Sequence, residues 1–172
     1  STVITTHLTE VIKDNITDLL TYSETQKLIE GLQTEHKKLA SDIIPSQISV
    51  TALQRVLQGL LNEGVSIRDL PTILEAISEA STSVSNVVAI IEHVRSRLAK
   101  QICYANSNDK GYVPFLILSP QWEQTFMESI VGDTDKQLSL PPSKLQEFVL
   151  TVNKEIEKHA MTGEIPVILT SP

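Results

Sequence analysis

Residues 51–80 constrain the fold most strongly, because they carry two apolar stripes separated by a short polar turn. In each stripe, branched aliphatic residues recur every three or four positions, which is the spacing of one face of a helix. The stripes consist of Leu53, Val56, Leu57, Leu60 and Leu61, and then Leu70, Ile73, Leu74 and Ile77. Gly64 suits the left-handed end of a helix, and Asp69 suits the N-cap of the next one. We therefore expect a helical hairpin around which the rest of the chain packs.

The segments before and after the hairpin predict a largely helical first part. A β-branched run over residues 2–6 favours extended backbone, and apolar spacing then predicts a helix up to residue 20. Further helices are expected over residues 23–32, 35–44 and 86–102, the first of them opened by a capping box at Ser23.

The pattern changes after Cys103. Residues 113–118 and 164–170 are short apolar runs of strand length, and helices are expected after Ser119 and after a capping box at Ser143. Strands separated by helices indicate a parallel sheet. The expected fold class is thus α+β and mostly α-helical, with a helical part followed by an incomplete α/β part that contains a small parallel sheet. We place the boundary near residue 100.

Composition narrows the functional classes. The net charge of −7 and the 4% aromatic content disfavour nucleic-acid binding, which depends on basic side chains and stacking platforms. The single cysteine, Cys103, cannot form an intrachain disulfide and fits a reducing compartment. No apolar run approaches the length of a membrane-spanning helix.

No motif predicts catalysis. His7, His36, His93 and His159 lack partners at metal-ligand spacing, and no signature of a nucleophile surrounds Cys103. Phosphate-loop, dinucleotide-binding and serine-elbow motifs are absent from the sequence. We therefore expect a protein that is not an enzyme and that has no cofactor and no metal.

The hairpin also resembles a helix-turn-helix, so DNA binding is one alternative. The second helix offers mainly acidic side chains, namely Asp69, Glu75 and Glu79, which disfavours that alternative. Arg68 and Asp69 have two interpretations. Either Asp69 is a helix cap beside a solvated arginine, or the pair contacts a neighbouring subunit.

Three segments carry a resemblance to a known family: residues 6–12 (THLTEVI), residues 54–61 (QRVLQGLL) and residues 65–75 (VSIRDLPTILE). Together with residues 163–170 (GEIPVILT), they resemble the cytosolic domain of the FlhA family, the export-gate proteins of flagellar and virulence type III secretion. The flagellar branch fits better. A virulence export gate and a generic helical adaptor are the alternatives.

The resemblance implies a fragment of a membrane protein. Residues 1–20 would be the closing strand and helix of a first cytosolic subdomain, residues 21–99 an all-helical third subdomain, and residues 100–172 a fourth α/β subdomain that is truncated at its C-terminus. The full protein would lie at the cytoplasmic face of the bacterial inner membrane, anchored by a preceding membrane region, whereas the fragment itself would be soluble.

The resemblance also implies partners. The domain would form a nine-membered ring below the export channel and receive chaperone–substrate complexes and soluble export components. Thr6 would lie at the edge of the chaperone-docking site, and Arg68 and Asp69 would be possible contacts with the neighbouring protomer.

Overall fold

The computed structural model describes residues 2–81, 86–132 and 137–170. The chain divides into two compact units, Ser1–Ile102 and Cys103–Pro172, which we call the helical unit and the α/β unit. The expected fold class is confirmed, because helices dominate the described residues and a two-stranded parallel sheet lies in the α/β unit.

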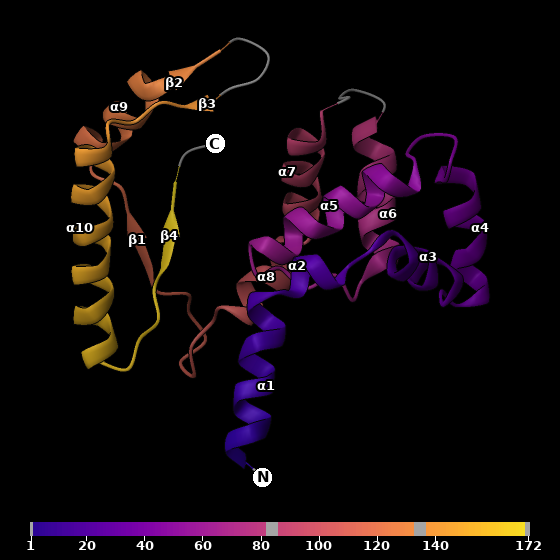
Figure 1. Ribbon diagram of the computed structural model, residues 1–172, viewed down its shortest axis with the longest axis horizontal. Helices are drawn as coiled ribbons and strands as arrows, with labels where there is room; N and C mark the ends of the chain where they lie inside the picture. The colour runs from indigo at the N-terminus through magenta and orange to yellow at the C-terminus, as the bar shows by residue number, and fades with distance from the viewer. Residues whose placement is uncertain (1, 82–85, 133–136, 171–172) are drawn as a thin grey trace. The chain divides into compact units, whose positions relative to one another are not determined.

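The helical unit is built from helices of 4 to 13 residues (Figure 1). They are α1 (Thr2–Asp14), α2 (Ile16–Leu19), α3 (Tyr22–Glu30), α4 (Thr34–Ile43), α5 (Val50–Asn62), α6 (Leu70–Ser81) and α7 (Val87–Arg97). Helix α8 (Ala99–Ala105) begins in this unit and ends beyond its boundary.

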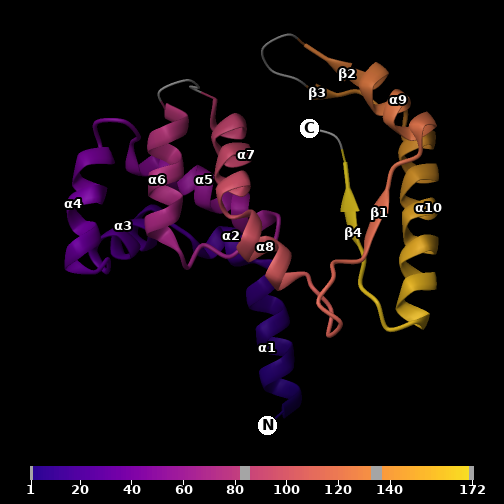
Figure 2. The ribbon, with the colours of Figure 1, turned by 180° about the vertical axis from the view of Figure 1, so that it is seen from behind.

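The predicted hairpin is confirmed and forms the centre of the helical unit. Its two apolar stripes are buried except for the half-buried Leu61, and Leu53, Leu57, Ile73 and Ile77 have no exposed surface. Gly64 follows the C-cap of α5 and has a φ of 73°, a conformation that favours glycine. Helix α6 packs against α4 on one side and α7 on the other, and Figures 1 and 2 show it between them.

The start of the chain differs from the sequence prediction. Residues 2–6 belong to helix α1, so the expected extended run and closing strand are wrong for these residues. β-Branched residues lose only a few tenths of a kcal/mol each in a helix, so a local preference of this size is easily overridden. The Thr9 hydroxyl also donates a hydrogen bond to the Thr5 carbonyl within the helix.

Two further boundaries are shifted. Helix α3 is capped by Thr21, whose hydroxyl accepts a hydrogen bond from the Glu24 amide, and not by Ser23. The helix expected over residues 86–102 is interrupted at Leu98, which separates α7 from α8. Leu98 is itself buried, four residues after the buried Val94, so the interruption leaves the core-facing side of the segment unchanged.

Beyond the end of α8, six elements lie among the described residues of the α/β unit. They are β1 (Phe115–Ile117), α9 (Pro120–Ser129), β2 (Ile130–Val131), β3 (Gln137–Leu138), α10 (Pro142–Met161) and β4 (Val167–Leu169). Strands β1 and β4 pair in parallel, with Leu116 opposite Ile168, as the sequence predicts. The antiparallel pair β2 and β3 was not predicted, and Ile130, which lies in β2, is 45% exposed. Residues 133–136, between β2 and β3 in the sequence, lie outside the described residues.

Of the two helix starts predicted in the α/β unit, one is confirmed and one is wrong. Ser119 caps α9 as predicted, because its hydroxyl accepts a hydrogen bond from the Trp122 amide. Helix α10 instead begins at Pro142 after Pro141, and the capping box at Ser143 is wrong. A proline fits the first turn of a helix, where amides have no intrahelical partner, so the helix starts two residues earlier than a Ser143 cap would place it.

The two faces of the parallel sheet differ in their surroundings. Leu116 and Ile168 line a cavity of about 250 Å³ together with Trp122, Phe148 and Val152 from α9 and α10. The opposite face is largely exposed within this unit and consists of Phe115, Ile117, Val167 and Leu169.

Candidate functional site

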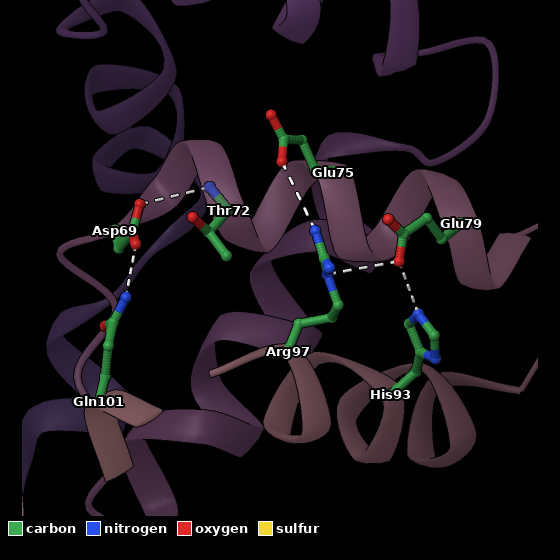
Figure 3. Close-up of polar contacts among 7 residues, drawn as sticks. All are labelled: Asp69, Thr72, Glu75, Glu79, His93, Arg97 and Gln101. Atoms are coloured by element: carbon green, nitrogen blue, oxygen red, sulfur yellow. Dashed lines mark hydrogen bonds and ion pairs between the residues drawn. The ribbon is translucent and has the colours of Figure 1, made fainter. Parts of the chain in front are cut away.

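The turn between α5 and α6 carries the two residues singled out by the sequence. Asp69 is half-buried, and one of its carboxylate oxygens accepts a hydrogen bond from the Thr72 amide at 3.3 Å. The other oxygen accepts one from the Gln101 side chain of α8 (Figure 3). The predicted cap is therefore confirmed, and the carboxylate is occupied inside the chain.

Arg68 differs from its neighbour. Its side chain is exposed, and its backbone amide donates a hydrogen bond to the Ser66 hydroxyl at 3.4 Å. Within the described residues its guanidinium group makes no ion pair. Of the two residues, Arg68 is thus the one that can offer charge to a partner.

A row of charged side chains joins α6 to α7. Arg97 lies 3.4 Å from the Glu79 carboxylate and 3.8 Å from that of Glu75, and His93 lies 3.1 Å from Glu79 (Figure 3). All four side chains are between 41% and 52% exposed, so each pair adds only a few tenths of a kcal/mol or so to stability. The row links two helices and leaves acidic side chains on α6, which is unlike a DNA-recognition helix.

Thr6 lies on the exposed surface of α1. The same helix carries four exposed apolar side chains, Ile4, Leu8, Val11 and Ile12, which are 44% to 75% exposed. At about 3.6 residues per turn, these four lie on one face and Thr6 lies on the opposite face. Thr6, the predicted docking residue, and the apolar face of α1 therefore lie on opposite sides of the helix.

The α/β unit has its own cluster of interacting side chains. The rings of Trp122, Phe126 and Phe148 have centroids 4.9 to 6.1 Å apart. Near the start of β4, the Tyr112 hydroxyl donates a hydrogen bond to Glu164, and His159 lies 3.5 Å from the same carboxylate. The Tyr112 hydrogen bond holds the pKa of Glu164 below its ordinary value, aided by His159.

The described residues show no arrangement with obvious chemistry. Over residues 2–81, 86–132 and 137–170, no group of histidine, cysteine and acidic side chains could hold a metal ion. Cys103 is exposed near the end of α8. In the same part of the chain, no helix combines the length and apolar character needed to span a bilayer.

Sequence analysis did not predict the side-chain contacts between elements that are distant in the chain. Gln101 binds Asp69 from 32 positions away, and Arg97 and His93 reach Glu79 from the next helix. The signal that was available is the spacing of Glu75 and Glu79 on α6 and of His93 and Arg97 on α7, four residues apart in each case.

Comparison with known proteins identifies the chain's relatives. A model described as the FHIPEP family matches residues 1–172. The chain is 52% identical over 173 residues to the flagellar biosynthesis protein FlhA of Caulobacter vibrioides, covering 100% of this chain and 25% of that protein. The chain thus spans about a quarter of the length of the curated relatives it matches.

Solved structures agree with this fold. A cryo-EM structure of nonameric EPEC SctV-C is 27% identical with a TM-score of 0.76, over 89% of this chain and 47% of that one. A complex of the Chlamydia pneumoniae CdsV and CdsO proteins matches with 25% identity and a TM-score of 0.76, over 88% of this chain and 45% of that one. The chain therefore belongs to the FHIPEP family, which includes the flagellar protein FlhA and is not a family of enzymes.

Proposed function

We propose that this chain is part of the cytosolic region of a flagellar type III protein export gate. The observation that carries the proposal is the family match over residues 1–172, together with 52% identity to a flagellar FlhA. The solved relatives SctV-C and CdsV are only 27% and 25% identical to this chain, so the 52% identity to a flagellar protein favours the flagellar branch over a virulence export gate. The full protein would act at the cytoplasmic face of the bacterial inner membrane.

The gate would work as a ring that docks export cargo. The relative SctV-C is nonameric, and its structure matches 89% of this chain, which supports a homo-nonamer here. CdsV was solved together with CdsO, which supports the docking of soluble export components. Chaperone–substrate complexes are the third class of partner that we propose.

Subdomain assignments belong to the same proposal. Residues 1–20 would be part of a first cytosolic subdomain, residues 21–99 a third and residues 100–172 a fourth. The exposed apolar face of α1 would then pack on the remainder of the longer protein, because four exposed aliphatic side chains on one helix indicate a missing neighbour. Thr6, on the opposite face, would stay accessible at the edge of the chaperone-docking site.

The docking role is tested by titrating the full-length protein with a flagellar chaperone–substrate complex. We expect Thr6→Ala to raise the Kd by roughly 3- to 10-fold, the loss that accompanies about one hydrogen bond. Thr151→Ala on α10 is the matched control, because Thr151, like Thr6, is exposed on a helix. Equal affinities for the wild type and the Thr6 variant would remove Thr6 from the site, and no binding by the wild type would contradict the docking role.

Ring contact through Arg68 is a separate part of the proposal. Arg68 is exposed and makes no ion pair among the described residues, whereas Asp69 would act by positioning the turn. We expect Arg68→Glu in the full-length protein to reduce the fraction of assembled rings. Arg55→Glu on α5 also reverses an exposed arginine and should leave assembly unchanged. Unchanged assembly in the Arg68 variant would show that this turn is not a contact.

A further inference from the structure

The α/β unit contains a cavity of about 250 Å³ between its parallel sheet and its helices. Figures 1 and 2 both show α10 alongside β1, and the lining residues come from these two elements, from α9 and from β4. Leu116 and Ile168 line it from the sheet, and Trp122, Phe148 and Val152 line it from the helices. All of these side chains are half-buried except Ile168, which is 38% exposed. The cavity therefore has a largely apolar wall that the unit itself does not fill.

The cavity is large enough for an aromatic ring. An apolar cavity of about 150 Å³ inside a protein binds benzene. The larger volume here admits one ring with a short substituent. Trp122 and Phe148 already pack edge to face, with centroids 5.1 Å apart, so a ring beside them would extend the aromatic cluster.

Charge on the cavity wall favours a neutral ligand. Among the described residues that line the cavity, Glu155 is the charged one. Lys158 donates a hydrogen bond to its carboxylate, which holds the pKa of Glu155 below its ordinary value. The ionised carboxylate disfavours an anion, and its pairing with Lys158 leaves no net charge to attract a cation.

Two hydrogen-bond donors on the cavity wall have no acceptor. The Ser119 hydroxyl accepts a hydrogen bond from the Trp122 amide, but its own hydrogen is not donated to any described residue. The indole N–H of Trp122 likewise has no acceptor within the described ranges, although a buried tryptophan N–H usually finds one. A carbonyl oxygen has two lone pairs and donates nothing, so it matches a pair of donors.

We propose that this cavity binds a small neutral aromatic ketone. The ring packs between the sheet residues Leu116 and Ile168 and the aromatic side chains of Trp122 and Phe148. The carbonyl oxygen accepts hydrogen bonds from Ser119 and from the Trp122 indole. This inference does not depend on the proposed export role or on the ring, because every group that contacts the ligand belongs to the α/β unit.

Photolabelling tests the site in the full-length protein. The probe is an acetophenone that carries a trifluoromethyl diazirine, and mass spectrometry locates the labelled residues after irradiation. We expect labels at Phe148 and Val152, reduced at least about tenfold by excess acetophenone. Val149 and Leu150 are 46% and 63% exposed on the same helix and do not line the cavity, so they report non-specific labelling. Equal labelling of both pairs, or labels that acetophenone does not reduce, would overturn the proposal.

Filling the cavity gives an independent readout. Val152→Phe should reduce labelling of Phe148 by at least about tenfold, because the added ring occupies the ligand's space. Val149→Phe is the matched control, because it makes the same change on the same helix outside the cavity. Amide hydrogen exchange in α10 shows whether each variant is folded. A folded Val152 variant that is labelled as strongly as the wild type would overturn the proposal.

A milder substitution tests the ligand class without filling the cavity. Ethylbenzene has the shape of acetophenone but lacks the carbonyl oxygen, so at equal free concentration acetophenone should compete roughly 3- to 10-fold better. Trp122→Phe keeps an aromatic ring and removes the indole donor, so this preference should shrink. Equal competition by the two compounds in the wild type would overturn the assignment to ketones. A phenylalanine-containing peptide that competes more strongly than acetophenone would assign the cavity to a bound peptide and overturn the assignment to a free molecule.

Discussion

At the scale of single residues, Gln54 and Gln58 tie the N-terminal helices to the helical core. The Gln54 amide donates a hydrogen bond to the Leu20 carbonyl at 2.9 Å. The Gln58 amide donates to the carbonyls of Thr17 and Leu20 at 3.0 and 3.1 Å. These carbonyls lie at the end of α2, where a helix leaves acceptors without intrahelical donors. Two glutamines of α5 thus act as a cap supplied from another element.

Gln58→Ala should destabilise the helical unit by about 1–2 kcal/mol, because it removes two partly buried hydrogen bonds from carbonyls that have few alternatives. Chemical denaturation followed by far-UV circular dichroism measures the difference. Gln26→Ala on α3 serves as the control, because Gln26 also lies inside a helix and its side chain is exposed. A loss as large in the control would assign the effect to helix propensity.

A second residue-scale prediction concerns acid stability of the α/β unit. The pKa of Glu164 is lowered mainly by the hydrogen bond from Tyr112, so the ionised form stabilises the fold. This contribution is present above the ordinary carboxyl pKa and is lost as the pH falls through the lowered value. Tyr112→Phe should therefore lower the melting temperature at neutral pH, and the difference from wild type should shrink in acid.

Melting curves at neutral and acidic pH test this difference. Tyr104→Phe is the control, because the side chain of Tyr104 is 84% exposed. A Tyr112 variant whose deficit stayed constant across pH would show that the tyrosine acts by packing and not through Glu164.

At the scale of elements, α5 and α7 approach each other closely at Gly59. A Cβ atom at this position would lie 2.4 Å from the Cδ1 atom of Ile91 and 3.3 Å from its Cγ1 atom. Glycine costs about 1 kcal/mol in a helix relative to alanine, so its presence here is best explained by this contact.

Gly59→Val should destabilise the helical unit by about 1–3 kcal/mol, because the added side chain overpacks the contact between α5 and α7. Adding Ile91→Ala to the same protein should recover part of the loss by making room. The double-mutant cycle measures this coupling from unfolding free energies. Strictly additive changes in unfolding free energy would mean that Gly59 and Ile91 are not sterically coupled.

The elements also show what local sequence can determine. The hairpin of α5 and α6 was predictable, because its apolar spacing, Gly64 and Asp69 all act over a few residues. The α3 boundary was not, because Thr21 and Ser23 are both acceptable caps and the choice depends on how Leu20 packs in the core. The two-residue strands β2 and β3 are too short to leave a periodic pattern.

The candidate site was likewise predictable only where it depends on local sequence. The exposed Arg68 and the capping Asp69 follow from their positions in a turn, whereas the hydrogen bond from Gln101 depends on tertiary packing. The cavity of the α/β unit has no signature in the sequence, because it arises from the packing of two helices on the sheet.

At the scale of the whole molecule, the two units differ in how much apolar surface they bury. Among the described residues, every fully buried large apolar side chain belongs to the helical unit, between Leu20 and Leu98. The aromatic cluster of the α/β unit is only half-buried, and one face of its sheet is largely exposed. The two units should therefore differ in stability.

Hydrogen exchange should resolve this difference. Amides of α5, α6 and α7 should exchange at least about tenfold more slowly than those of α9 and α10, because local opening costs less where little apolar surface is buried. Mass spectrometry of peptides from each helix measures the rates. Equal protection in all five helices would indicate that the two units unfold together.

The single tryptophan of the chain gives this division a practical use. Trp122 lies in the aromatic cluster of the α/β unit, against Phe126 and Phe148. Fluorescence excited where tyrosine does not absorb therefore reports on that unit alone, whereas far-UV circular dichroism is weighted toward the helical unit. The protein carries a natural optical probe of one unit, so the unfolding of each half can be followed in the same cuvette without a label.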